Sequence, residues 1–515
     1  MSQLATVVRA RGHLALFAIL GVLFVLPAAF APAMTHDSFW IDVSWSQQFT
    51  ALLREGNLYP RWLPWSYGGL GSSAFYYYAP LSFYLAGVFG LIGLPVYGAL
   101  LAAFGAAWIA SGVAMHAWLK GRSHAPVAGA LVYMVLPYHV MDFYGRGALA
   151  EFCAFAIAPL VALGVRHAVE RQKSGPLACA YATLILTHLP TAVIVSVLLI
   201  APYALWVTRA NLAQLLAVVR GVAGGLAGAA VYLVPALTLQ SYSSVGALWD
   251  VKFLQPTNWS LLHPEAWVSK SYVLLFAGLA LVSGAAAVIL SGRRWTFWTV
   301  WTAAICLIIA GLVPGFWSLP VIKAVQFPWR ALLLAEFGLA TLIASWRGSP
   351  VLATLAVLPL LMFSFLMATP ANPMHGEPMR PLPIPGLQDV IEYLPPGAVG
   401  AERSPHTDLL IQAAKAARMR PQSRFPYPSL EARCASGSAA LAPNPDSKLV
   451  VSAPTGCRVA VKRLPAELIG LAISLLAWLG IGATLVVGDV GQIAPRRPCA
   501  LPNRSSAAGC AGDSC

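Results

Sequence analysis

Charged side chains are scarce in this sequence. They make up 10% of its 515 residues, whereas a soluble chain carries roughly 25%. Acidic residues are the rarest, with 19 Asp and Glu against 33 Lys and Arg. Apolar residues instead account for 58%, and the mean hydropathy is +0.70. The shortage of charge excludes an ordinary soluble enzyme, and we predict an all-α polytopic protein that buries its apolar surface in a lipid bilayer.

The sequence also lacks a basic cluster, although its formal net charge is +14 at pH 7. The cations fall singly or in pairs between apolar runs, as the positive-inside rule expects of membrane proteins. The chain therefore offers no patch that suits nucleic acid, and the membrane lipid bilayer is its expected partner.

Nucleotide-binding and zinc-binding motifs are missing as well. The glycine-rich run Gly68–Gly71 lacks the Lys-Ser/Thr ending of a phosphate-binding loop and does not follow a strand. Near the carboxyl terminus, Cys499, Cys510 and Cys515 have a spacing that matches no metal site. The sequence therefore predicts neither a nucleotide site nor a structural metal site.

Apolar runs long enough to cross a bilayer, which takes about 20 residues, are what the sequence has instead. The first follows Arg9 and Arg11 and resembles a signal peptide, with a small-residue cleavage motif at Ala31–Ala33. Its apolar run is longer than the roughly 7–15 residues of a signal sequence, so we predict a retained span. The twelve predicted spans are residues 13–34, 96–119, 125–141, 150–168, 177–189, 190–207, 221–240, 271–291, 296–313, 331–346, 350–368 and 465–488.

A thirteenth apolar run, Pro80–Gly93, is short, and charge decides its place. If it does not span, the Lys and Arg residues of the short connections lie on the same side as Arg9, as the positive-inside rule requires. We therefore predict an interfacial or re-entrant helix on the outer face, in a multi-pass protein of a bacterial inner (plasma) membrane with both termini cytoplasmic. Carboxylate chemistry is then expected outside, because the acids left inside are Glu170, Asp489 and Asp513.

The segment after the eleventh span differs from the rest. It begins rich in proline, and the alternation over Lys448–Ala453 and Arg458–Lys462 predicts short strands. The predicted domains are a transmembrane domain at 1–368 with its first outer loop at 35–95, an extracytoplasmic domain at 369–463, the last transmembrane helix at 464–488 and a disordered cytoplasmic tail at 489–515.

Cys434 and Cys457 are the two cysteines of the extracytoplasmic segment. In an oxidising compartment they are expected to form a disulfide that closes a modest loop. Two free thiols are the alternative.

The first outer loop holds two carboxylates and a histidine at the mouth of the first span: His36, Asp37 and Asp42. An amphipathic helix over about 42–55 is predicted to follow. The many Trp and Tyr residues of this loop are those of an interfacial anchor belt, which does not explain the acids. Asp37 lies where a lipid-linked and a water-borne substrate meet, and it suits a general base for an incoming hydroxyl. The alternative is that Asp37 caps the amphipathic helix or pairs with Arg61.

Two further outer connections carry polar residues at span ends. Arg146 and Glu151 lie where charge is expensive unless it is paired or useful. They form either a structural ion pair or, through Arg146, a site for an anionic head group. His188 joins two short spans, either as a packing residue or as a ligand.

The last outer cluster places Lys323, Gln326 and Arg330 just before a span that carries Glu336. Arg binds phosphate through its planar fork, and Lys supplies a point charge. The cluster either anchors the chain to lipid head groups or recognises a polyprenyl phosphate.

Together these segments resemble the GT-C class of membrane glycosyltransferases. More narrowly, they resemble the bacterial membrane family labelled 6-pyruvoyl-tetrahydropterin synthase-related, a label that implies no pterin chemistry here. The resemblance covers about residues 13–346. Its matching pieces are Thr35–Asp37, GNLYPRW at Gly56–Trp62, Tyr67–Gly71, Tyr77–Leu81, Arg146–Glu151, Pro159–Leu160, Thr187–Leu189 and QFPWR at Gln326–Arg330.

The resemblance implies a polyprenyl-phosphate-sugar-dependent glycosyltransferase of inverting type that acts on the extracytoplasmic face. The sugar would pass from a polyprenyl-phosphate donor to a glycan, lipid or protein acceptor. Asp37 matches the catalytic acid of the class by position. Arg146, Lys323 and Arg330 would neutralise the leaving lipid phosphate. Substrate contacts are expected from His36, Asp42, Arg61, Tyr77, Arg146, Glu151, His188, Lys323, Gln326 and Arg330.

No cofactor is firmly implied. Some members of the class use a divalent metal and others do not, and His36, Asp37 and Asp42 are too few to define a metal site. A second acid could come only from Asp142 or Glu265, so a divalent metal is left open.

Two rival functions remain. A transporter or flippase of lipid-linked substrates would carry ionisable groups in mid-span, and Glu336 is the main such residue. A non-catalytic membrane scaffold for envelope assembly would instead use 369–463 to bind a partner.

Overall fold

The computed structural model describes residues 2–30, 38–209, 211–244, 252–292, 295–369, 389–399 and 407–490. Two predicted site residues, His36 and Asp37, lie outside these ranges, as does nearly all of the predicted cytoplasmic tail. Most of the described chain is helical, and the rest includes two small sheets. The prediction of a helical bundle with a small β-containing part is therefore confirmed.

Helices occupy every predicted span. Seven are long and apolar enough to cross a membrane, and up to nine if each of two bent pairs is one span. The chain is thus a multi-pass membrane protein. The long helices are α1 (Ser2–Phe30), α6 (Val96–Leu119), α9 (Leu149–Arg171), α11 and α12 (Leu189–Val195 and Ala201–Thr208, joined by the π-helical turn η2, Ser196–Ile200), α15 (Lys270–Ser291), α18 (Pro350–Met367) and α20 (Pro465–Val490).

The number of twelve spans is not confirmed. Three of the predicted spans are the short helices α10 (Gly175–Thr187), α16 (Phe297–Ile309) and α17 (Leu332–Ser345). At 1.5 Å per residue, helices of 13 and 14 residues fall short of the roughly 30 Å of a hydrocarbon core. The number of full crossings therefore stays a prediction.

Two predicted spans are bent pairs. Helices α7 (Pro126–Val135) and α8 (Pro137–Met141) are bent relative to each other by 42°. Helices α13 (Leu212–Gly228) and α14 (Ala230–Thr238) are bent by 70°. At the first bend Leu136 is extended, with φ −66° and ψ 155°, because the ring of the following proline disfavours a helical conformation at the residue before it. The π-helical turn η1 (Asp142–Arg146) then continues α8.

The first outer loop folds back on the bundle. Its amphipathic helix is α2 (Phe39–Arg54), and two short helices follow, α3 (Ser66–Gly69) and α4 (Ala74–Tyr77). The run predicted to be interfacial is α5 (Leu81–Leu91), which packs on α2 and α6. Aromatic side chains of α2 and of the loop, among them Trp45, Phe49 and Phe75, form a separate buried cluster there.

The small domain contains one helix, α19 (Thr407–Met419), and two antiparallel three-stranded sheets. In one sheet β5 (Ser447–Ser452) lies between β1 (Ser423–Arg424) and β4 (Ala442–Asn444). In the other, β2 (Leu430–Cys434) lies between β3 (Gly437–Ala439) and β6 (Arg458–Val461). A disulfide joins Cys434 to Cys457. The two strands expected from sequence are β5 and β6.

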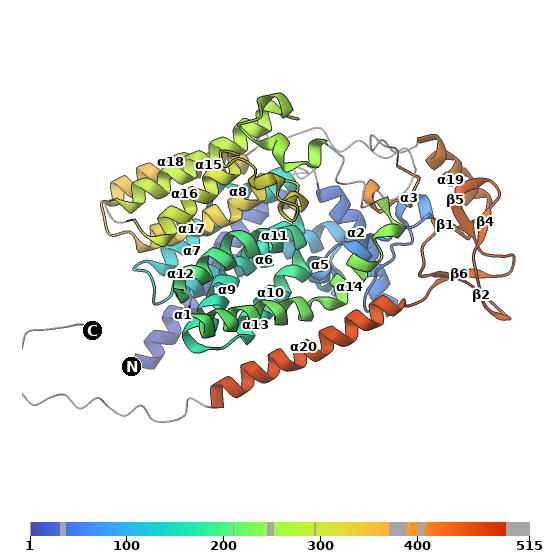
Figure 1. Ribbon diagram of the computed structural model, residues 1–515, viewed down its shortest axis with the longest axis horizontal. Coiled ribbons are helices and arrows are strands. Elements are labelled where there is room, and N and C mark those ends of the chain that lie inside the picture. Colours follow the sequence, from blue (N-terminus) through green and yellow to red (C-terminus); the bar gives the residue numbers. More distant parts are fainter. Residues whose placement is uncertain are drawn as a thin grey trace, which may run out of the picture.

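Figure 1 shows the small domain at one end of the helical bundle, with α20 running along the bundle away from it. The beginning of α1 and the far end of α20 lie at the opposite end. The side of the membrane that each end faces stays a prediction.

The small domain packs directly on the first outer loop. Phe425 donates its backbone N–H to the carbonyl of Leu70 (2.9 Å), and the Tyr67 hydroxyl donates to the carbonyl of Val390. The buried carboxyl of Asp389 accepts from the Trp45 indole (2.9 Å). These contacts hold the segment 389–393 against α2 and the loop that follows it.

The disulfide should stabilise the small domain chiefly by restricting its unfolded state. For a bridge that spans 23 residues, loop-closure entropy is worth about 3 kcal/mol. The double variant Cys434→Ala/Cys457→Ala should therefore raise the hydrogen-exchange rates of amides in β2 and β6 by roughly 100-fold. The matched control is Cys179→Ala in α10, and equal exchange in both proteins would contradict the prediction.

The docking of segment 389–393 should weaken as pH rises. Burial raises the pKa of Asp389 to about 6 from its ordinary 3.8, against the opposing effect of its hydrogen bonds. As pH rises, Asp389 therefore ionises in the undocked segment before it does so in the docked one. The free energy of local opening should fall by roughly 3 kcal/mol between pH 3.8 and about 6.

The measurement is hydrogen exchange at the amides of 389–393 as a function of pH, corrected for intrinsic exchange rates. Asp389→Asn should abolish the difference in opening free energy across this window. The same pH profile in both proteins would refute the role of Asp389.

Candidate functional site

A buried charge cluster lies where two predicted outer connections meet. Arg146, at the end of η1, donates from Nη1 to Asp142 Oδ1 (2.9 Å) and Glu151 Oε2 (2.7 Å). The three side chains are at most 5% exposed. The Tyr138 hydroxyl also donates to Glu151. The predicted ion pair between Arg146 and Glu151 is therefore present, and it belongs to a larger network.

Glu151 binds a second cation. Nε of Arg330, on the 3-10 turn η10 (Pro328–Ala331), donates to Glu151 Oε2 at 3.1 Å. Nη1 of Arg330 donates to the carbonyl of Val325 (2.7 Å) and to Gln326 Oε1 (3.3 Å). Glu151 thereby joins α9 to the QFPWR segment, which lies 179 residues away along the chain.

Gln326 takes an unusual backbone conformation in this segment. Its φ is +69° and its ψ −50°, and the Phe327 N–H donates to the carbonyl of Val325 (2.8 Å). This is a γ-turn of the rare, strained kind. Strained residues persist where the surroundings fix them, and the turn brings the Gln326 amide within reach of Arg330.

Glu336 of α17 has a different partner. Its carboxylate accepts from the backbone N–H groups of Tyr138 and His139 (3.2 Å for the latter). These groups open α8 after the break at Leu136, so Glu336 satisfies donors that a helix start leaves free. The residue that most favoured a transporter therefore supports a helix end.

A cavity of about 420 Å³ lies in front of Arg330, between α2, α14, the start of α11 and segment 390–393. Both α2 and α14 lie toward the end of the bundle that carries the small domain (Figure 1). The polar side chains that line the cavity are Ser38, Asp42, His188, Gln240, Gln326, Arg330 and Glu392, and the aromatic ones are Trp45, Tyr77, Tyr78, Tyr232 and Tyr393.

Two polar side chains of the cavity, those of Asp42 and His188, have partners on the protein side. Asp42 of α2 accepts from the N–H of Leu149 (3.0 Å), the first residue of α9. His188 separates α10 from α11, and its Nδ1 lies 2.7 Å from the Thr191 hydroxyl. Since backbone and side-chain partners fix both groups, the cavity is largely pre-formed.

The aromatic wall joins the first outer loop to the segment after the eleventh span. The rings of Tyr77 and Tyr393 are stacked, with centroids 5.9 Å apart and planes 4° from parallel. The Tyr77 hydroxyl donates to the carbonyl of Leu239 (2.5 Å), and it lies 3.1 Å from the Tyr427 hydroxyl. The small domain thus contacts the wall of the cavity.

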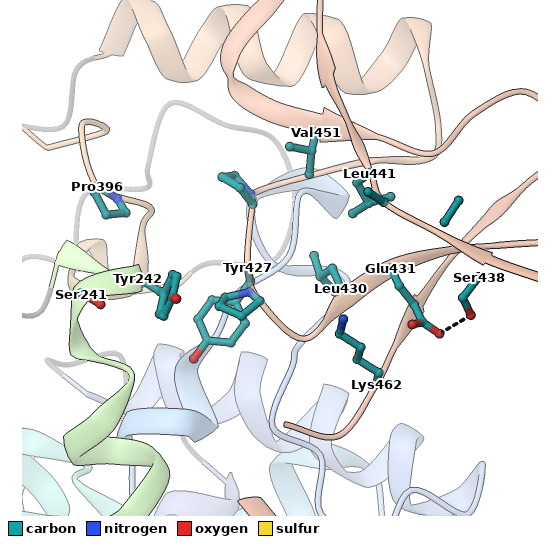
Figure 2. Close-up of a pocket in the computed structure, with 14 residues that line it drawn as sticks. Ser241, Tyr242, Pro396, Tyr427, Leu430, Glu431, Ser438, Leu441, Val451 and Lys462 are labelled. Atoms are coloured by element: carbon teal, nitrogen blue, oxygen red, sulfur yellow. Dashed lines mark hydrogen bonds between the residues drawn. The ribbon is translucent and has the colours of Figure 1, made fainter. Parts of the chain in front are cut away.

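A wider hollow of about 700 Å³ lies on the small domain itself. Figure 2 shows Tyr242 and Tyr427 toward one end of it and Glu431, hydrogen-bonded to Ser438, toward the other. Since the Tyr427 hydroxyl also contacts that of Tyr77, the walls of the two cavities touch at this pair of residues.

The structure brings many of the predicted site residues together. Asp42, Tyr77, His188, Gln326 and Arg330 line the 420 Å³ cavity, and Glu151 and Arg146 lie behind Arg330. Three cationic residues of the predicted site lie outside this lining. Arg146 is inside the charge cluster, where its predicted ion pair is present, Lys323 is exposed on η9 (Ile322–Val325), and Arg61 lines another cavity. Of the three predicted phosphate-binding cations, Arg330 is therefore the one found in this lining.

Sequence reasoning missed Glu392 and Tyr393, on the 3-10 turn η11 (Ile391–Tyr393). Both lie in the segment assigned to the extracytoplasmic domain, yet they line the cavity. The local pattern here is an acid next to an aromatic residue in a proline-rich stretch. Such a pattern does not predict a contact with residues more than 300 positions earlier in the chain.

No group of three His, Cys, Asp or Glu side chains that would hold a metal occurs in the described part of the chain. Of His36, Asp37 and Asp42, which are too few to define a metal site by themselves, two lie outside that part. A divalent metal therefore stays an open prediction.

No protein-family model and no curated protein matches this chain. Among solved structures, the chain is similar to the cryo-EM structure of the arabinofuranosyltransferase AftD from mycobacteria, with 18% identity and a TM-score of 0.46 over 71% of this chain and 27% of that one. A structure of a mutant of the same enzyme gives 17% identity and a TM-score of 0.44, over 70% and 27%. The matches span about a quarter of that enzyme, and scores this low establish neither a shared fold nor a shared activity.

Glu151 should matter far more to stability than an exposed acid in a similar pair. Glu151→Gln leaves two buried guanidinium groups short of a counter-charge, which costs about 3–5 kcal/mol. The control is Glu170→Gln, which breaks the exposed Arg166–Glu170 pair and should cost under about 1 kcal/mol.

The denaturant midpoint of the purified protein in detergent measures both effects. Equal shifts for Glu151→Gln and Glu170→Gln would contradict the structural role of the cluster.

Proposed function

We propose that this chain is an integral membrane glycosyltransferase of the GT-C type, which transfers a sugar from a polyprenyl-phosphate donor to an acceptor on the extracytoplasmic face. The observation that carries the proposal is the single cavity that collects two carboxylates, Asp42 and Glu392, with the guanidinium of Arg330. This pairing of acids with a cation suits a reaction that removes a proton and releases an anion.

The chemistry is a substitution at the anomeric carbon of the sugar. A carboxylate accepts the proton of the acceptor hydroxyl, whose oxygen forms the new bond to the anomeric carbon. The bond from that carbon to the phosphate oxygen breaks, and its electron pair leaves with the lipid phosphate. Asp37 is the proposed base by resemblance, and it precedes Ser38, which lines the cavity. Asp42 and Glu392 are the acids among the described lining residues.

Arg330 is the proposed partner of the leaving phosphate. Its Nε and Nη1 are used by Glu151, Val325 and Gln326, whereas Nη2 has no hydrogen-bond partner within the described ranges. A guanidinium whose Nε and Nη1 are fixed in this way leaves Nη2 set for an oxyanion, so little reorganisation is needed as charge develops. Glu151 and Arg146 act behind it as positioning residues.

The aromatic side chains of the cavity suit the rest of the task. Trp45, Tyr78 and Tyr393 are buried or half-buried rings that keep water from the reacting atoms, and Tyr77 and Tyr232 turn hydroxyls toward neighbouring backbone. Rings with a polar tip contact both the apolar and the hydroxyl faces of a sugar.

Asp37→Asn should abolish sugar transfer while the protein stays folded and inserted. Loss of a general base lowers the rate by about 100-fold or more. The assay uses membranes of a strain that lacks the chain and is complemented with the wild type or the variant. A labelled lipid-linked sugar pool is followed by mass spectrometry of lipid-linked and surface glycans.

Glu55→Gln removes an exposed acid from the same outer loop and should leave transfer unchanged. Asp42→Asn and Glu392→Gln tell whether a described acid acts instead. Full activity of Asp37→Asn would remove it from the mechanism, and full activity of all three single variants would sink the proposed chemistry.

A further inference from the structure

A second cavity, of about 520 Å³, lies between the first outer loop and the beginning of α20. It shares no lining residue with the cavity in front of Arg330. One wall comes from residues 57–62, another from the first two turns of α20, and between them lie α4, α5 and the residue Val231. Its charged lining residues are Arg61, Lys462, Arg463 and Glu467.

Arg61 is the buried cation of this cavity. It is 4% exposed, and its guanidinium lies 3.7 Å from the centre of the Tyr59 ring. Nη2 donates to the carbonyl of Val231 (2.6 Å), and Nε lies 3.3 Å from Glu467 Oε2. Nη1 is buried without a hydrogen-bond partner in the described ranges. An unmet buried donor of this kind is costly, and an anion in the cavity would satisfy it.

The charge of the cavity is positive. Three cations face one carboxylate, Glu467, which already accepts from the Tyr76 hydroxyl (3.0 Å) and the N–H of Leu464 (3.1 Å) besides its contact with Arg61. Lys462 and Arg463 are exposed residues separated from α20 by Leu464 alone. The start of α20 adds the positive end of its helix dipole. Lys462 also borders the hollow on the small domain (Figure 2).

Part of the remaining lining is apolar and lies on α20, which is long and apolar enough to cross a membrane. Leu468 and Leu471 stand on the first turns of α20 and are 51% and 37% exposed. Leu81 and Leu186 complete the apolar side. The cavity therefore has cations where α20 begins and leucines along its first turns, which is the order of polar and apolar layers in one leaflet of a bilayer.

We propose that this cavity binds the phosphate head group of a single membrane lipid, in the leaflet next to the small domain, with the lipid chain along Leu468 and Leu471. The phosphate lies between Arg463 and Lys462 at the rim and satisfies Arg61 inside. The site is separate from the reaction cavity and does not rest on the proposed glycosyl transfer. A polyprenyl phosphate and a phospholipid share the recognised group.

The test is lipid binding by the full chain, delipidated in a neutral detergent and titrated with short-chain phosphatidic acid in native mass spectrometry. The matched lipid without phosphate is diacylglycerol of the same chain length. Since one cation near a lipid phosphate contributes a factor of roughly five, Arg463→Gln should weaken phosphatidic acid binding about fivefold and Lys462→Gln/Arg463→Gln about 25-fold. Binding of diacylglycerol should be weak and unchanged.

Lys448→Gln is the control variant, because Lys448 is an exposed cation on β5 of the same domain and lines no described cavity. It should bind like wild type. Competition by polyprenyl phosphate at lower concentration than phosphatidic acid would identify the prenyl chain as the preferred one, and the reverse order a phospholipid; both support the site.

Three outcomes overturn the proposal. The first is equal binding of phosphatidic acid and diacylglycerol. The second is an equal weakening of phosphatidic acid binding in Lys448→Gln and Arg463→Gln. The third is displacement by inorganic phosphate at the same concentration as the lipid, which would make the cavity a site for a free anion. Because the readout is binding, a failure of sugar transfer leaves this result untouched.

Discussion

The carboxylate of Glu151 holds two guanidinium groups in a part of the chain that water does not reach. Charge is expensive in such surroundings unless every group is paired, and here Arg146, Arg330, Asp142 and Tyr138 complete the set. The network ties η1, α9 and η10 to one point. Arg330 faces the 420 Å³ cavity from this anchor, so the geometry of the proposed site follows from the burial of Glu151.

The cavity owes its shape to interrupted helices. The chain leaves helical geometry at Leu136, at His188 and at Gln326, and each interruption lies beside the charge cluster or the cavity. Non-helical backbone within a membrane protein is tolerated where protein buries it or where it lines a cavity. Glu336 supports one of these breaks by accepting the first N–H groups of α8.

Much of the architecture was predictable because it depends on local composition. Apolar runs gave the helices, the aromatic face of residues 42–55 gave α2, and alternation gave β5 and β6. The number of crossings stays a prediction, since a short run such as that of α10 is as apolar as a long one. For the site, local motifs predicted Arg330, Gln326 and His188. That Arg330 lines the cavity whereas Arg146 lies behind it depends on packing that no local pattern encodes.

The place of Glu392 in the cavity lining was likewise not predictable from local sequence. The residue reaches the cavity because segment 389–393 docks on α2 through Asp389, Trp45 and Tyr67, and such a contact between distant segments leaves no mark on either. The small domain is thus part of the site's surroundings, and segment 389–393 contributes three of the lining residues, Val390, Glu392 and Tyr393.

The most direct test of the central claim is a reconstitution. The purified chain in proteoliposomes is supplied with a lipid-linked sugar pool and a mixture of candidate acceptors, and both new glycosidic products and movement of the lipid-linked sugar across the bilayer are measured. The proposed function predicts a product with a new glycosidic bond and release of the lipid phosphate. Movement of the intact lipid-linked sugar with no new bond would contradict it and establish a transporter.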